Sequence, residues 1–140
     1  MHVREDIMRK NVLVFPCGSE IGIEVNRALS FSTHFELYGS SSVDSHHGKY
    51  VFKNMVENLP MIDDDRFIDE LNKLIVKYNI DFIFPAHDSV VTFMAQHRRK
   101  IRAQIVTSDY ETCRICRSKG ETYKVFQGIV EVPEVYSGQK

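Results

Sequence analysis

The fold is decided by residues 11–29, which read NVLVFPCGSEIGIEVNRAL. The first six, Asn11–Pro16, are β-branched or apolar on both faces, which is typical of a strand that is buried on two sides. Residues 18–20 follow as a turn, in which Ser19 is suited to cap a helix. Apolar residues then recur at helical spacing as far as Leu29. The stretch therefore predicts a strand, a turn and a helix.

The same alternation continues along the chain. Further strands are expected at Phe35–Tyr38, Asn54–Leu59, Asp81–Phe84 and Gln104–Thr107. Helices are expected within Val43–Phe52, at Phe67–Tyr78 with caps from Asp63–Asp65, after a cap at Asp88 or Ser89, and from about Asp109. Strands that alternate with helices indicate a parallel sheet with helices on both faces. Right-handed crossovers then favour a three-layer, Rossmann-like α/β fold, with a doubly wound sheet of about five strands in the order 3-2-1-4-5.

The composition sets limits on the class of protein. A chain of 140 residues with 43% hydrophobic and 26% charged residues suits one globular domain. Its net charge of −1 offers no field for a nucleic acid or a membrane surface, and we expect neither as a partner. Three cysteines and a charged N-terminus without an apolar signal core lead us to expect reduced thiols and a cytoplasmic location.

A ligand site is expected where the winding of this sheet reverses, between the first and fourth strands. The crevice beyond the carboxyl ends of the strands is where such sheets bind ligands. The turn after the first strand precedes a helix, whose free N–H groups could hold an anion. The loop after the fourth strand adds an imidazole and a carboxylate. The residues predicted to contact a small-molecule substrate are Gly18, Ser19, Glu20, Ser40, His87 and Asp88.

Two other motifs do not support a cofactor or metal site. Gly18-x-x-x-Gly22 lacks the G-x-G-x-x-G spacing of a dinucleotide site, and Gly39 stands where an acidic residue would accept the ribose hydroxyl. The pair Cys113-x-x-Cys116 falls within a helical stretch and has no second paired motif to complete a zinc site. We expect both cysteines to be buried on one helix face, and we expect no metal.

Two further segments carry a resemblance to a known family. Residues 77–88 read KYNIDFIFPAHD, and residues 118–136 read SKGETYKVFQGIVEVPEVY. With residues 11–29, they resemble the N-terminal, or pre-ATP-grasp, domain of ATP-grasp ligases. In that family the fourth strand typically reads iDfiiP…D, and the run DK…ty.fl…GipvP.ty leads into the ATP-grasp fold. The resemblance covers nearly the whole chain and is strongest to the carbamoyl-phosphate-synthase-like branch.

The resemblance implies a division of the chain and a function. Residues 1–117 would form the pre-ATP-grasp domain, and residues 118–140 would connect it to a C-terminal ATP-grasp domain that this chain lacks. Such enzymes use ATP and Mg²⁺ to activate a carboxylate, which an amine then attacks. Lys119 would contact the ATP phosphates, as a lysine can, while Ser118 stands where the family usually has Asp. The implied partners are the absent domain and a small carboxylate or amine.

Other interpretations remain open. By itself this chain would not catalyse ligation, and we expect no tight binding of ATP or Mg²⁺ to it, although both would serve the full-length ligase. The alternative is a free-standing Rossmann-like or flavodoxin-like module that binds a small anion or a nucleotide at the crevice. A third is a scaffold, since an apolar surface intended for the absent domain could also produce a homodimer.

Overall fold

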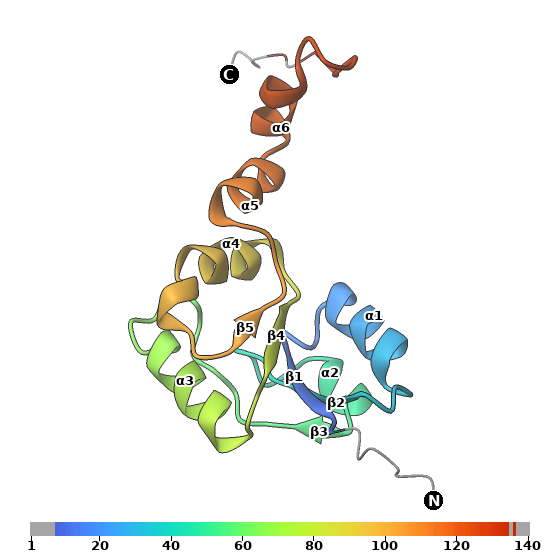
Figure 1. Ribbon diagram of the computed structural model, residues 1–140, viewed down its shortest axis with the longest axis vertical. Coiled ribbons are helices and arrows are strands. Elements are labelled where there is room, and N and C mark those ends of the chain that lie inside the picture. The colour runs from blue at the N-terminus through green and yellow to red at the C-terminus, as the bar shows by residue number, and fades with distance from the viewer. Residues whose placement is uncertain (1–7, 135, 137–140) are drawn as a thin grey trace, which may run out of the picture.

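The structure is a computed structural model that describes residues 8–134 and Tyr136. The described residues form one parallel sheet, in the order β3-β2-β1-β4-β5 (Figure 1). Its strands are β1 (Lys10–Phe15), β2 (Phe35–Gly39), β3 (Asn54–Met55), β4 (Phe82–Pro85) and β5 (Gln104–Ile105). The helices are α1 (Glu20–Leu29), α2 (Gly48–Val51), α3 (Phe67–Lys77), α4 (Asp88–Gln96), α5 (Tyr110–Arg117) and α6 (Lys119–Phe126), with a 3₁₀ turn at Arg98–Lys100. The predicted α/β fold and strand order are confirmed.

The central strand β1 shows why this sequence forms a two-sided sheet. Leu13 and Phe15 point to one face, and Val12 and Val14 point to the other, and all four are buried. Val12 lies opposite Phe82 of β4, so the same alternation continues onto the neighbouring strand. Burial on both faces explains why β1 reads as an unbroken apolar run rather than as an alternating one.

The first face of the sheet is covered by α3 and α4. The apolar stripe of α3 packs onto Leu13 and Phe15 of β1 and onto Ile83 of β4, and α4 adds Val90 and Met94. This side holds the larger of the two apolar clusters, and its largest side chains are fully buried. We conclude that most of the hydrophobic stabilisation comes from this face.

The second face is covered unevenly. Helix α1 packs against β1 and β2 and contacts α2. The part formed by β4 and β5 is less protected: Phe82 and Phe84 are only half-buried, and Gln104 is exposed. Two helices therefore shield one half of this face, and the other half keeps apolar side chains close to solvent.

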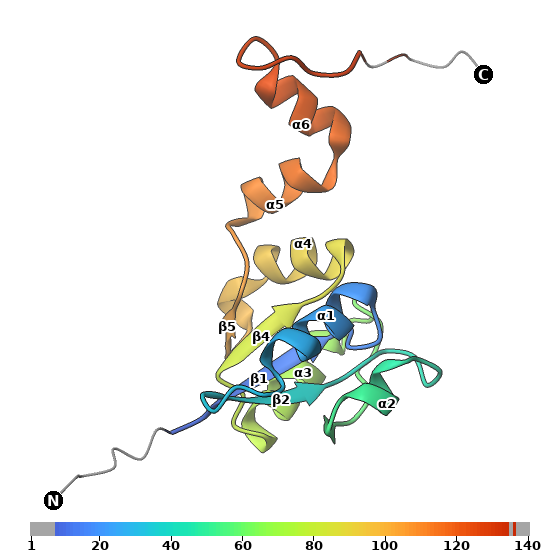
Figure 2. The same ribbon diagram turned by 90° about the vertical axis from the view of Figure 1, so that its right-hand side faces the viewer.

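Helices α5 and α6 form an arm that rises from the sheet. Helix α5 packs on α4, and α6 packs on α5 (Figure 2). Thr122 Oγ1 donates a hydrogen bond of 2.9 Å to the carbonyl of Ile115, and Arg114 lies 3.8 Å from Glu121. No residue of α6 is buried. The division of the chain at residue 117 stays a prediction, and residues 1–7, 135 and 137–140 lie outside the described part.

The helix starts confirm one predicted cap and correct two. Ser19 Oγ accepts a hydrogen bond from the N–H of Gly22 at 3.0 Å, as predicted. Helix α4 is capped by neither Asp88 nor Ser89, because His87 Nδ1 accepts from the N–H of Ser89 at 3.3 Å.

The start of α3 also differs from the prediction. Its cap position is occupied by Arg66, which makes no side-chain cap hydrogen bond. Asp64 does not cap the helix; its carboxylate accepts from the backbone N–H and the guanidinium of Arg66. These bonds hold the pKa of the Asp64 carboxyl at about 2. The acidic run therefore orders the turn before α3, and the first turn of the helix receives no side-chain cap hydrogen bond.

Candidate functional site

An open cleft of about 700 Å³ lies beyond the carboxyl ends of β1 and β4. Pro16, which follows β1, and His87, which follows β4, both line it. The loop after β2 and the loop before α3 contribute Val43 and Asp63, while α4 and α5 contribute further residues. The cleft therefore lies where the winding of the sheet reverses, the place where doubly wound sheets bind ligands.

The polar groups of the cleft suit an anionic or oxygen-rich ligand. The Arg117 guanidinium of α5 donates a 3.1 Å hydrogen bond to Ser89 Oγ of α4, and within the described residues it pairs with no carboxylate. His87 Nδ1 accepts the hydrogen bond that caps α4. In the neutral imidazole the proton then lies on Nε2, which becomes a donor. Arg117 and His87 are thus two donors on the wall of one cleft.

Apolar side chains complete the lining. Phe93 is half-buried, and its ring meets those of Phe67 at 5.5 Å and His97 at 4.3 Å between centroids. These aromatic contacts hold the Phe93 ring in place beside the cleft. Val43 and Met61 are exposed on the loops across from α4 and α5. A few fixed donors beside apolar walls are the usual composition of a small-molecule site.

Of the six predicted substrate contacts, His87 alone lines this cleft. Ser40 is fully buried, and its hydroxyl donates to the carbonyl of Glu57 at 2.7 Å. Asp88 lines a separate hollow of about 210 Å³ between α4 and α5. The structure places Ser40 and Asp88 outside the cleft, and their part in ligand binding stays a prediction.

Beyond Pro16, residues 18–20 of the turn after β1 are not part of the cleft lining, and the loop before α2 packs against Gly18. A Cβ placed on Gly18 would lie 2.6 Å from the Cβ of His46. Ser19 is engaged as the cap of α1. Glu20 lines an apolar groove along α1, on the second face of the sheet. Gly18 therefore takes part in a packing contact, Ser19 caps a helix, and Glu20 lies on another surface of the protein.

Sequence reasoning missed most of the residues that line the cleft. On α4 the spacing of Ser89, Phe93 and Gln96 places these side chains on one flank of the helix. Phe93 reads as a core residue in the sequence, and Arg117 reads as a basic residue that complements the helix dipole. The i, i+4, i+7 spacing on α4 was the signal that could have identified Ser89, Phe93 and Gln96, whereas Arg117 lies on α5, outside that pattern.

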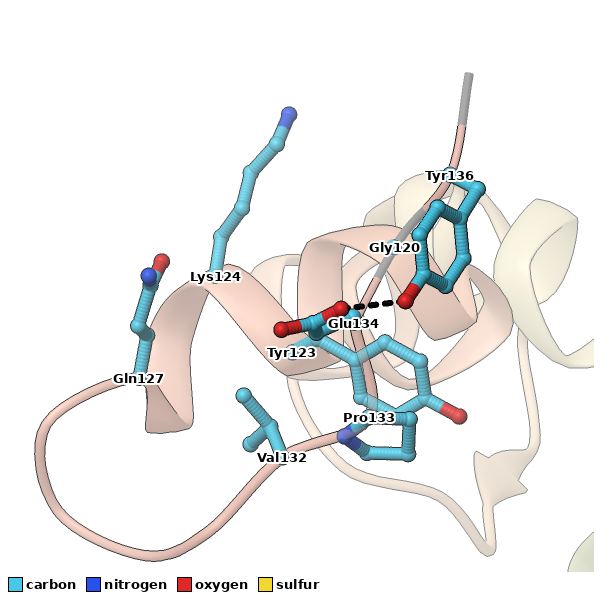
Figure 3. Close-up of a pocket in the computed structure, with 8 residues that line it drawn as sticks. All are labelled: Gly120, Tyr123, Lys124, Gln127, Val132, Pro133, Glu134 and Tyr136. Atoms are coloured by element: carbon cyan, nitrogen blue, oxygen red, sulfur yellow. Dashed lines mark hydrogen bonds between the residues drawn. The ribbon is translucent and has the colours of Figure 1, made fainter. Parts of the chain in front are cut away.

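A second cavity, of about 470 Å³, lies between α6 and the segment that follows it (Figure 3). Tyr123 and Pro133 lie close together in it, and the Tyr136 hydroxyl donates to the Glu134 carboxylate, which raises the pKa of Tyr136. Lys119, the first residue of α6, is exposed, and no ion pair or hydrogen bond of its side chain occurs among the described residues.

The thiols do not form a reactive or metal-binding centre with one another. Cys17 is fully buried, and burial raises the pKa of its thiol to about 11, so it is protonated at neutral pH. Cys113 is buried and lies 3.2 Å from Thr107 Oγ1. The prediction that Cys116 is also buried was wrong, because α5 buries only a narrow face against α4. Among the described residues no group of three or more His, Cys, Asp or Glu side chains could hold a metal ion, and no helix has the length and apolar character needed to cross a membrane.

The fold has clear structural neighbours. Glycinamide-RNase-transformylase T from Mycobacterium tuberculosis superposes with a TM-score of 0.62 at 13% identity, over 86% of this chain and 35% of that one. N5-carboxyaminoimidazole synthetase from Staphylococcus aureus, in complex with ADP, gives 0.58 at 10% identity, over 86% and 30%. L-amino acid ligase from Bacillus licheniformis gives 0.55 at 16% identity, over 85% and 30%.

These three proteins are ATP-grasp-family ligases. The chain shares its fold with a part of each of them. It spans about a third of their length. No protein-family model and no curated protein matches the sequence. The expected ATP-grasp resemblance is thus supported at the level of the fold, and identities of 10–16% carry no individual residue across.

Proposed function

We propose that this chain is the N-terminal, substrate-side domain of an ATP-dependent carboxylate–amine ligase, and that it does not catalyse ligation by itself. The observation that supports this most is the fold shared with three ATP-grasp ligases, over 85–86% of this chain and only about a third of theirs. The resemblance of residues 118–136 to the segment that leads into an ATP-grasp fold is independent of that superposition. The resemblance over nearly the whole chain favours the carbamoyl-phosphate-synthase-like branch.

Lys119 is assigned to the ATP phosphates. It stands exposed at the first position of α6, where a positive helix end adds to its own charge. Ser118 Oγ accepts from the N–H of Glu121 at 3.3 Å and so caps α6. A serine therefore supplies the cap that the family's usual aspartate could supply, and Lys119 is left to contact phosphate oxygens as a point charge. The carboxylates that hold Mg²⁺ would come from the absent ATP-grasp domain.

The cleft is assigned to the substrate. In a ligase of this type a carboxylate oxygen attacks the γ-phosphorus of ATP and ADP leaves; an amine then attacks the acyl carbon and phosphate leaves. The donors on Arg117 and His87 would bind substrate oxygens, and Phe93 would pack against its apolar part. Holding one reactant in a fixed orientation is a contribution that a non-catalytic domain can make.

Steady-state kinetics of the full-length ligase tests this assignment. Lys119→Ala should raise the KM for ATP or lower kcat by about tenfold or more, because a phosphate contact is lost. Arg117→Gln should raise the KM for the carboxylate or amine substrate by a similar factor and leave the KM for ATP unchanged. Lys73→Ala, which removes another exposed lysine on α3, is the control and should change neither.

Two results would contradict the proposal. One is an equal effect from Lys119→Ala and Lys73→Ala. The other is a gene in which no ATP-grasp domain follows codon 140 and no partner gene encodes one.

A second candidate is a free-standing module that binds a small anion or a nucleotide. It is favoured by the cleft itself, since Arg117 and His87 lie on one wall and need no second domain to meet a ligand. Calorimetric titration of the 140-residue chain with phosphate, ATP, ADP and amino acids tests it. Binding that Arg117→Gln abolishes would support the module, and no binding would remove its support.

A further inference from the structure

Three soft donor atoms meet beside α2, near the carboxyl ends of β1 and β3. Cys17 Sγ lies 3.8 Å from His46 Nδ1 and 4.0 Å from Met55 Sδ. Cys17 follows β1, His46 lies in the loop before α2, and Met55 ends β3. The three residues are far apart in the sequence and form no motif, which is why the sequence alone leads us to expect no metal.

Glycines allow each of the three donors to come so close. A Cβ on Gly48 of α2 would lie 2.5 Å from the sulfur of the thiol, and a Cβ on Gly18 would lie 3.0 Å from the imidazole Nδ1. On β2, a Cβ on Gly39 would lie 3.0 Å from the sulfur of the thioether. A side chain at any of these positions would push a donor atom out of the cluster. The cluster thus depends on three positions that carry no side chain.

The surroundings of the cluster limit the charge that it can hold. Cys17 is fully buried and packs in the smaller apolar cluster with Val14 and Phe52, while His46 and Met55 are half-buried. An unpaired charge in apolar surroundings is costly. A thiolate and a monovalent cation together are neutral, whereas a divalent cation would leave one positive charge in place. The site therefore suits a monovalent ion.

The donor set and its spacing indicate which ion fits. Thiolate and thioether sulfurs are soft ligands that favour Cu(I), whereas hard ions such as Mg²⁺ favour oxygen. With the bond lengths known for zinc, about 2.3 Å to sulfur and about 2.0 Å to nitrogen, the donors around a planar three-coordinate ion lie about 3.7–4.0 Å apart. The distances of 3.8 and 4.0 Å agree with this spacing. Side chains of His, Cys, Asp and Glu alone form no such group among the described residues, so the thioether of Met55 is essential to the site.

We propose that Cys17, His46 and Met55 bind one Cu(I) ion in a three-coordinate site. On binding, Cys17 Sγ releases its proton to solvent, and the thiolate, His46 Nδ1 and Met55 Sδ each donate an electron pair to the ion, with no change of oxidation state. His46 is partly exposed on its loop and gives the ion a route to the buried thiol. None of the three residues lines the cleft, so this proposal does not depend on the proposed ligase function.

Anaerobic titration of the 140-residue chain with Cu(I), in competition with a chromogenic Cu(I) chelator, tests the site. The wild-type chain should take one Cu(I) ion per chain from the chelator. Cys17→Ser and Met55→Leu should each weaken binding by more than the about 10–100-fold that loss of an outer-shell partner costs. Met55→Leu conserves side-chain volume, so it keeps the test valid if Cys17→Ser does not fold.

Two matched controls should leave the affinity for Cu(I) unchanged. Cys116→Ser removes an exposed thiol on α5. His47→Gln removes the imidazole next to His46, whose side chain makes no cap hydrogen bond to α2. Binding that is lost in Cys116→Ser but kept in Cys17→Ser would overturn the proposal, and so would a wild-type chain that takes no Cu(I) from the chelator.

X-ray absorption at the copper edge tests the donor set directly. The spectrum of the wild-type complex should show two sulfur neighbours at about 2.3 Å and one nitrogen at about 2.0 Å, and Met55→Leu should lose one sulfur. Because the ion would join β1, β3 and the loop before α2, Cu(I) should also raise the Tm of the wild-type chain more than that of Met55→Leu. Copper surrounded by nitrogen and oxygen alone, or an equal rise in Tm for both chains, would contradict the proposed site.

Discussion

Gly22 lies in the first turn of α1, directly over the turn that follows β1. A Cβ at this position would stand 2.9 Å from the carbonyl oxygens of both Pro16 and Cys17, which are backbone atoms with little freedom to move. Gly22→Ala should therefore destabilise the protein by about 1–3 kcal/mol, although alanine favours a helix more than glycine does. Urea unfolding followed by circular dichroism measures the loss.

The control for this prediction is Gly120→Ala in α6. There the nearest atom to an added Cβ is Ser118 Oγ at 3.9 Å, so nothing opposes the helix preference of alanine. We expect the free energy of unfolding to stay unchanged or to rise by up to about 1 kcal/mol. If Gly22→Ala were as stable as Gly120→Ala, the close helix–turn contact would not exist.

The cleft of the structure lies where the sequence predicts a crevice, but of the six predicted contacts His87 alone lines it. His87 was found because it directly follows a strand that the apolar pattern marks clearly. Ser40 follows a strand equally closely, yet its hydroxyl turns inward to the carbonyl of Glu57. The direction of a loop side chain depends on what packs over the loop, such as His46 over Gly18. A single sequence contains no record of such contacts.

Asp81 joins three neighbouring strands at the amino-terminal edge of the sheet. Its carboxylate accepts from the N–H of Asn11 at 2.9 Å and from Lys10 Nζ at 2.9 Å, and its backbone carbonyl accepts from the N–H of Gln104. The bond from Asn11, and then the one from Lys10, lowers the pKa of this carboxyl below its usual 3.8. The carboxylate thus fixes β4 beside β1 in its charged form.

This linkage predicts how stability depends on pH. A lowered pKa gives stability that is present above pH 3.8 and is lost as the pH falls through the lower value of the folded state. Asp81→Asn should cost about 1 kcal/mol at pH 7, a small value because the carboxylate is 31% exposed. The difference should shrink as the pH falls below 3.8, where the carboxyl of the unfolded chain becomes protonated. Urea unfolding midpoints at pH 7 and at a pH below 3.8 measure this difference in stability, and Asp65→Asn is the control. A difference that does not depend on pH would show that the charge of Asp81 is not its cause.

At the level of elements, the sequence succeeded where one physical signal dominates. Long apolar stripes such as that of α3 identify helices, and two-sided apolar runs identify β1 and β4. The predicted cap of α4 was wrong because Asp and Ser are common cap residues, which favoured Asp88 and Ser89, whereas the nitrogen of a histidine such as His87 is an uncommon acceptor in that role. Strand β3 has only two residues and is defined by its pairing with Tyr38 and Gly39, so local sequence marks it weakly.

The whole molecule divides into a body with two apolar clusters and an arm with none. The clusters lie on the two faces of the sheet, and the arm is held to the body through α5 on α4. Arg98 strengthens that attachment, because its guanidinium donates to the carbonyls of Ile105, Thr107 and Ser108. Within the part of the chain that the structure describes, helix α6 has no such anchor to the body, so its stability depends on its short contact with α5 and on its cap.

Hydrogen exchange should therefore separate the arm from the body. Amides of α6 should exchange orders of magnitude faster than those of α3, since α6 buries no residue whereas α3 buries Phe67, Leu71, Leu74 and Ile75. Mass spectrometry of peptides covering residues 119–126 and 67–77 measures both rates. In the proposed full-length ligase the α6 amides should become protected, because the proposed ATP-grasp domain would cover them. Equal protection of α6 and α3 in the 140-residue chain would show that the arm is already packed against another surface, whether its own body or a second copy.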